Sequence, residues 1–158
     1  MRTVFRIEHR LGVPTPAGVA WALLAKPEAW PDWNPMTQKV RGILHIGDRL
    51  ILTEQVGEER PRESRPTVQD WEPGSQILLR FSERVGLLTR LRYLEIEKLT
   101  DEACIFSIGE DWSGPLARFS DRRRRRALRA AFKAAAEALR DNAVALAATG
   151  AAQQTTTA

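Results

Sequence analysis

The hydrophobic period of the chain changes at Gly114-Pro115, and this change constrains the fold more than any other feature. Before it, apolar residues recur mainly at every second position, as in strands with one buried face. After it they recur every three or four positions, as in an amphipathic helix. With Leu128 at the centre of the helical face, the residues within ~40° at 100° per residue are Phe132, Ala135, Leu139 and Leu146. A sheet followed by one long helix predicts an α+β fold with the helix on one sheet face.

The strand-forming region supplies a clear inward face. Residues 3 to 11 alternate between polar and apolar side chains, which predicts a first strand. Turn residues divide the region from Gln38 to Trp112 into about six more strands. Two short helical segments are expected between the first strand and this region. The alternate positions expected to point inward are Ile77, Leu79, Phe81, Cys104, Phe106, Ile108, Glu110 and Trp112.

Length and composition predict one domain. The chain has 158 residues and 43% hydrophobic content, enough for one substantial core. We place the domain at residues 1–148 and expect the polar tail, 149–158, to be disordered. The start lacks the hydrophobic run of a secretory signal, and no apolar stretch is long enough for a membrane span. With Cys104 as the single cysteine, a cytoplasmic location is expected.

The net charge of +4 is unevenly distributed. Residues 1 to 114 contain 15 basic and 17 acidic side chains, whereas residues 115 to 158 contain 9 basic and 3 acidic side chains. The basic excess therefore lies on the final helix, above all in the run Arg122–Arg126. Such local basicity does not favour a general nucleic-acid-binding domain.

Short motifs occur in a fixed order along the chain. A small helix at Val19–Leu24 precedes Trp33-Asn34-Pro35, the basic segment Lys39-Val40-Arg41-Gly42 follows, and Glu110-Asp111-Trp112-Ser113-Gly114 precedes the final helix. In this order the chain resembles the START-like superfamily, and within it the polyketide cyclase/dehydrase and lipid-transport group, over residues 3 to 146. The resemblance implies a helix-grip fold: a curved antiparallel sheet of about seven strands, two short helices and a long C-terminal helix that enclose a pocket.

The resemblance also implies a small hydrophobic ligand in that pocket, a lipid or a polyketide-like metabolite held for sequestration or transport. Small residues on the helix, such as Ala131, Ala135 and Ala138, would leave room for it. Trp30, Trp33 and Asn34 are expected at the pocket entrance, with the alternative that they anchor a loop. The expected walls, with ordinary core packing as the alternative, are Leu79, Phe81, Phe106, Ile108, Trp112 and Phe132.

Glu110 is the polar residue that says most about a possible site, because a carboxylate on an inward sheet face needs a hydrogen-bonding or charged partner. Arg92 and Arg124 are the candidates to pair with it. A structural ion pair is one interpretation, and a ligand-orienting or acid/base pair is the other. In the second case the protein would be a cyclase or dehydratase in which Glu110 moves a proton.

The sequence leaves catalysis open but predicts no cofactor and no metal, because phosphate-binding loops, nucleophile elbows, paired metal ligands and dinucleotide fingerprints are absent. A third hypothesis is RNA or acidic-partner binding by Arg122–Arg126, although no aromatic residues are interleaved there. The chain departs from the family pattern in this run, which puts positive charge near one mouth of the expected pocket. Exposed strand edges also allow a homodimer.

Overall fold

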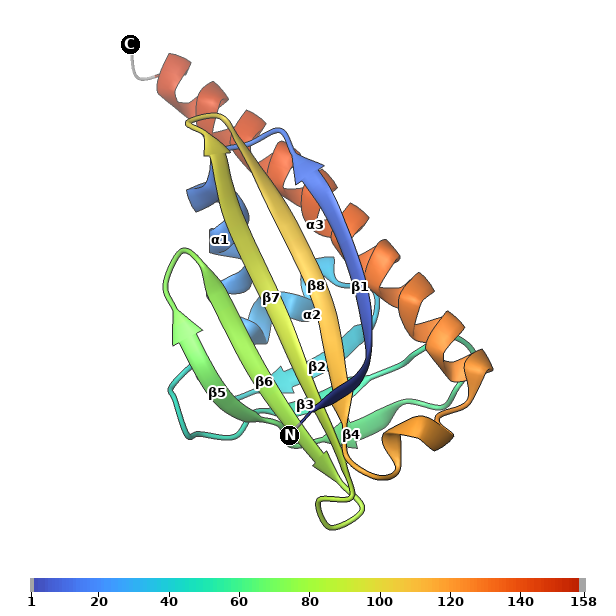
Figure 1. The fold of residues 1–158 in the computed structure, drawn as a ribbon. Helices are drawn as coiled ribbons and strands as arrows, with labels where there is room; N and C mark the ends of the chain where they lie inside the picture. The colour runs from blue at the N-terminus through green and yellow to red at the C-terminus, as the bar shows by residue number, and fades with distance from the viewer. Residues whose placement is uncertain (1, 157–158) are drawn as a thin grey trace.

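The computed structural model describes residues 2–156 and contains two antiparallel sheets and one long helix (Figure 1). The larger sheet has five strands in the order β1-β8-β7-β6-β5, and the smaller has three in the order β2-β3-β4. The strands are β1 (Thr3–Val13), β2 (Thr37–Arg41), β3 (Ile51–Glu54), β4 (Arg62–Ser64), β5 (Thr67–Glu72), β6 (Gln76–Glu83), β7 (Leu88–Thr100) and β8 (Ala103–Ser113).

The helices lie on one side of the larger sheet, with the longest running diagonally across it (Figure 1). They are α1 (Ala17–Leu24), α2 (Trp30–Trp33), α3 (Arg122–Thr156) and the short 3₁₀ turns η1 (Pro27–Ala29) and η2 (Ala117–Phe119). This arrangement confirms the predicted α+β helix-grip fold. The described chain has eight strands where about seven were expected. The three-residue β4 has no fully buried side chain, so it carries no alternating signal.

The predicted inward faces of β6 and β8 are buried. Ile77, Leu79 and Phe81 are at most 3% exposed, whereas the alternate residues Arg80 and Ser82 are exposed. The five alternate positions of β8 are also buried, and they are Cys104, Phe106, Ile108, Glu110 and Trp112. The apolar residues at every second position therefore correctly predicted which face of the sheet is buried under α3.

The helix α3 contributes the other half of the core. Its buried side chains are Leu128, Phe132, Ala135, Ala136, Leu139 and Ala143. The prediction that Leu146 belongs to this stripe is wrong, since it is 44% exposed. The last turns of α3 extend beyond the sheet (Figure 1).

The C-terminal tail was expected to lose order from residue 149. In the structure α3 continues through Gly150 to Thr156, so the described part of that segment is helical. Residues 157 and 158 lie outside the described residues. No helix within residues 2–156 combines the length and apolar character that crossing a membrane requires.

A glycine at the centre of β8 allows a tyrosine to cross the outer face of the sheet. Gly109 is paired with Glu8 on one side and Tyr93 on the other. The Tyr93 hydroxyl passes over Gly109 and donates to Glu8. A Cβ atom at Gly109 would lie 2.3 Å from the Tyr93 hydroxyl oxygen and 2.9 Å from the Ile7 carbonyl oxygen. Burial and the Glu8 carboxylate raise the pKa of Tyr93 above its ordinary value.

We predict that Gly109→Ala lowers the free energy of unfolding by ~2–3 kcal/mol, because the ring and the neighbouring strand must both move. Gly12→Ala is the matched strand control, since a Cβ there meets nothing within 4 Å. Urea denaturation of the two variants measures the difference. Equal stability of the two alanine variants would show that Tyr93 does not need the space above Gly109.

Candidate functional site

A fully buried carboxylate lies on the inner face of β8. Glu110 has no exposed surface, and the register pairs it with Arg92 on β7. One carboxylate oxygen of Glu110 accepts hydrogen bonds from Arg90 Nη1 at 2.9 Å, Arg92 Nε at 2.9 Å and Arg92 Nη2 at 2.6 Å. The other oxygen accepts from the indole N–H of Trp112 at 2.8 Å. Both oxygens of Glu110 are therefore occupied by protein donors.

The two arginines have further acidic partners. Arg90 Nη2 lies 2.6 Å from a carboxylate oxygen of Glu83 at the end of β6. Arg92 donates through Nη1 to Glu54 at the end of β3. The guanidinium of Arg90 also lies 4.4 Å from the ring centroid of Phe81. Two buried cations are thus surrounded by three carboxylates and an aromatic face, an arrangement that offsets the cost of removing them from water.

This network determines the protonation state of Glu110. Burial alone would raise its pKa, but the charges and hydrogen bonds of Arg90 and Arg92 outweigh burial and lower the pKa to about 2. Glu110 therefore stays ionised at neutral pH. A proton carrier works best with a pKa near the working pH, and Glu110 lies far from that range. The geometry supports the structural ion pair over the acid/base pair.

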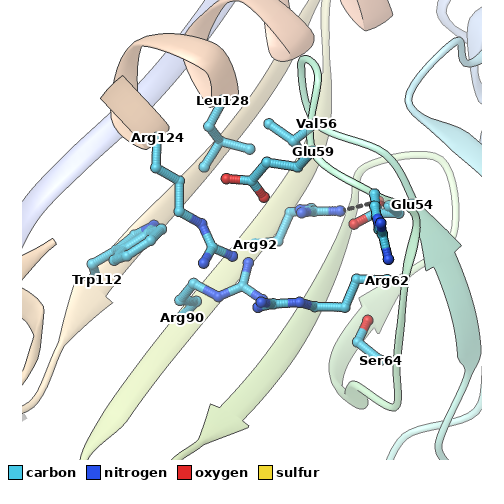
Figure 2. A pocket seen from close by; sticks show the side chains of 11 residues that line it. Glu54, Val56, Glu59, Arg62, Ser64, Arg90, Arg92, Trp112, Arg124 and Leu128 are labelled. Atoms are coloured by element: carbon cyan, nitrogen blue, oxygen red, sulfur yellow. Dashed lines mark hydrogen bonds and ion pairs between the residues drawn. The ribbon is translucent and has the colours of Figure 1, made fainter. Parts of the chain in front are cut away.

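A small cavity lies beside this network, between the first turns of α3, the inner face of β7 and β8, and the segment from β3 to β4 (Figure 2). Its volume is about 40 Å³. At ~10–15 Å³ for each enclosed water, it has room for about three water molecules. Its lining residues are Glu54, Val56, Glu59, Arg60, Arg62, Ser64, Arg90, Arg92, Trp112, Arg124 and Leu128.

The structure places three of the predicted ligand-binding residues at this cavity: Arg92, Trp112 and Arg124. Glu110 does not line the cavity itself, but it accepts hydrogen bonds from Arg92 and Trp112, which do. The remaining wall candidates are buried in the core and do not line it, and they are Leu79, Phe81, Phe106, Ile108 and Phe132. Bulky apolar side chains of the sheet and α3 fill most of the space expected for a ligand.

The tryptophan segment lies away from the cavity. Trp30 and Trp33 are buried, and their indole N–H groups donate to the carbonyl oxygens of Leu24 at 3.1 Å and Leu23 at 3.0 Å. The Asn34 side-chain oxygen accepts from the backbone N–H of Met36 at 3.0 Å. These bonds connect the segment to the end of α1 and to its own turn. The geometry favours the loop-anchor interpretation for all three residues.

Sequence reasoning named one of the two arginines that bind Glu110. Arg92 is a partner, whereas Arg124 lines the cavity without a hydrogen bond to Glu110. Arg90 was missed, although it shares the inner face of β7 with Arg92 at a spacing of two residues. Glu54 and Glu83 were missed as well, because no local pattern shows that two strand ends approach the same pair of arginines.

The arginine run occupies the start of α3. Arg122, Arg123 and Arg126 are exposed, whereas Arg124 and Arg125 are half-buried. The guanidinium of Arg125 lies 5.1 Å from the ring centroid of Phe5. The run therefore divides into an outward group and two side chains that turn toward the sheet.

We predict that Glu110→Gln lowers the free energy of unfolding by ~3 kcal/mol at neutral pH, because it leaves Arg90 and Arg92 buried with too little negative charge. Glu97→Gln is the control, since Glu97 pairs with Arg10 on the exposed face and should cost under ~1 kcal/mol. Chemical denaturation measures both. A loss of similar size in the two variants would contradict a dominant role for the buried pair.

The stability difference between the wild type and Glu110→Gln should depend on pH. The folded-state pKa of Glu110 is about 2, below its ordinary value of 4.5, so its ionised form stabilises the folded state above pH 4.5. That contribution is lost as the pH falls from 4.5 toward 2. Denaturation of both proteins at several pH values should show the difference narrowing with acidity. A difference that is constant down to ~pH 3 would contradict this account.

Comparisons with known proteins agree with this fold. A family model described as polyketide cyclase / dehydrase and lipid transport matches residues 4–147. A START superfamily protein from Mycobacterium smegmatis superposes with a TM-score of 0.69 at 15% identity, over 89% of this chain and 98% of that one. The Zhui aromatase/cyclase from Streptomyces sp. R1128 superposes with a TM-score of 0.63 at 21% identity, over 88% of this chain and 93% of that one.

A plant protein has the same fold. Ginseng major latex-like protein 151 from Panax ginseng gives a TM-score of 0.70 at 9% identity, over 87% of this chain and 96% of that one. Among curated proteins, no sequence matches this chain significantly. These structural likenesses lie below 25% identity and establish the fold, while the family match covers nearly the whole chain. The chain belongs to the polyketide cyclase/dehydrase and lipid transport family.

Proposed function

We propose that this protein binds a small, mainly apolar molecule under the first turns of α3, for sequestration or transport. The observation that carries the proposal is the position of the cavity, where apolar side chains of α3 and the sheet meet an interior opening. Val56, Trp112 and Leu128 supply the apolar contacts there. Family membership supports the same conclusion, since the family model is described in terms of lipid transport.

A guest larger than a few atoms requires the cavity to open. The segment from Gln55 to Pro61 closes it, and residues 57 to 61 of this segment are exposed. Gly57 has a φ of +60°, and a Cβ there would lie 3.2 Å from the Cβ of Ala127 on α3. The segment thus lies against α3 through a close but small contact, which a ligand can displace at low cost.

A shallow depression on the surface continues the cavity outward. It has a volume of about 380 Å³ and shares Val56, Glu59 and Arg124 with the interior cavity. Displacing these three side chains would join the two spaces. The combined volume would lie within the ~300–1,000 Å³ of ordinary ligand pockets.

Binding is favoured over the cyclase or dehydratase alternative. Glu110 is inaccessible, holds hydrogen bonds on both oxygens and has its pKa lowered to about 2. A group in this state is poorly suited to exchange a proton with a substrate. Binding of RNA or an acidic partner by Arg122–Arg126 gains no specific support, because Asp121 and Glu58 lie beside this run.

We predict that Val56→Trp weakens binding of the neutral apolar dye Nile red by ~10-fold or more, because the indole fills the cavity mouth. Val144→Trp is the matched control, as Val144 is 42% exposed on a distant part of α3. Fluorescence titration measures binding, and thermal unfolding confirms that both variants fold. Absence of saturable binding by the wild type, or unchanged binding by a folded Val56→Trp variant, would overturn the proposal.

A further inference from the structure

We propose that the cavity receives a carboxylate at one end of the ligand, held by Arg124 of α3 together with Arg60 and Arg62 at the mouth. The inference rests on the proposed function and narrows the ligand class to amphipathic carboxylates, molecules with an apolar chain or ring system and one acidic end. It depends on which positive charges around the cavity are already neutralised.

The two innermost arginines, Arg90 and Arg92, are already neutralised by carboxylates of the protein. Arg90 is bonded to Glu83 and Glu110, and Arg92 is bonded to Glu54 and Glu110. Their positive charge is matched by carboxylates within hydrogen-bond distance. An incoming anion that bound them would have to displace Glu110, which lies under the cavity without exposure.

The three outer arginines differ in this respect. Within residues 2–156, no carboxylate lies within ion-pair distance of Arg60, Arg62 or Arg124. The cavity lining contains two acidic side chains. Glu54 is paired with Arg92, whereas Glu59 has no ion-pair partner among residues 2–156. Three unpaired guanidinium groups therefore share the cavity with one unpaired carboxylate, which leaves an excess of positive charge.

The side chains converge on the same space. Figure 2 shows Arg124 descending from α3 toward Arg90 and Arg92, while Arg62 reaches across from β4 on the opposite side. Holding like charges around a small partly enclosed volume is unfavourable, because screening by water is reduced there. An anion between them relieves this repulsion.

Cavity size and shape favour a carboxylate. The volume of about 40 Å³ accommodates a group of a few heavy atoms and excludes a bulky head group. A planar guanidinium binds a planar carboxylate through two parallel N–H···O bonds. Val56, Trp112 and Leu128 would contact the first carbons behind the carboxylate.

The test compares decanoate with decan-1-ol, which has the same chain length but carries no charge. Isothermal titration calorimetry below the critical micelle concentration should show decanoate binding ~10-fold or more tightly to the wild-type protein. Arg124→Gln should remove most of this preference while decan-1-ol binding persists. Arg62→Gln provides a second variant at an exposed position, with a smaller loss of preference expected.

Arg122→Gln is the matched control, since Arg122 lies in the same helical turn, is exposed and does not line the cavity. It should keep the wild-type preference. Equal affinity of the wild type for decanoate and decan-1-ol would overturn the carboxylate site and leave ligand binding intact. The same conclusion follows if Arg124→Gln and Arg62→Gln, both folded, keep the full preference. Failure of both molecules to bind would overturn the proposed function together with this inference.

Discussion

The buried ion pairs of Glu110 determine how β7, β8 and the smaller sheet can pack. The carboxylate joins Arg90 and Arg92 on the inner face of the sheet, and these extend the network to Glu83 and Glu54. Since Glu54 ends β3, the network joins the smaller sheet to the larger one. Removing one member leaves the others charged and buried, so the cluster contributes as a unit.

The same network limits what the site can do. A carboxylate that is ionised and fully bonded orients its neighbours, and in the proposed site the outer arginines are the groups that would meet a ligand. Phe106 and Phe132 are buried in the core and do not line the small cavity, so the proposed ligand binding would require movement of the segment between β3 and β4. In the proposed function the exposed segment would move to admit a guest, while the bonded Glu110 network would preserve the fold.

The sequence predicted the elements with strong periodicity. The alternation in β6 and β8 and the helical stripe through Leu128 identified the core faces correctly. The short β4 and the exposure of Leu146 could not be predicted, because each depends on which neighbouring element lies within reach. At the site, the need of Glu110 for a partner followed from its inward position. The choice of Arg90, and the filling of the expected pocket, depended on tertiary packing.

Direct titration of the Glu110 side-chain carboxyl by carbon-13 NMR tests this account most simply. A resonance that stays at its ionised position throughout the neutral range, with a pKa of about 2, is the predicted result. It would agree with a fixed anion beneath a binding cavity. A midpoint between ~pH 6 and ~pH 8 would contradict the account, because Glu110 would then exchange protons under working conditions and the site would suit catalysis.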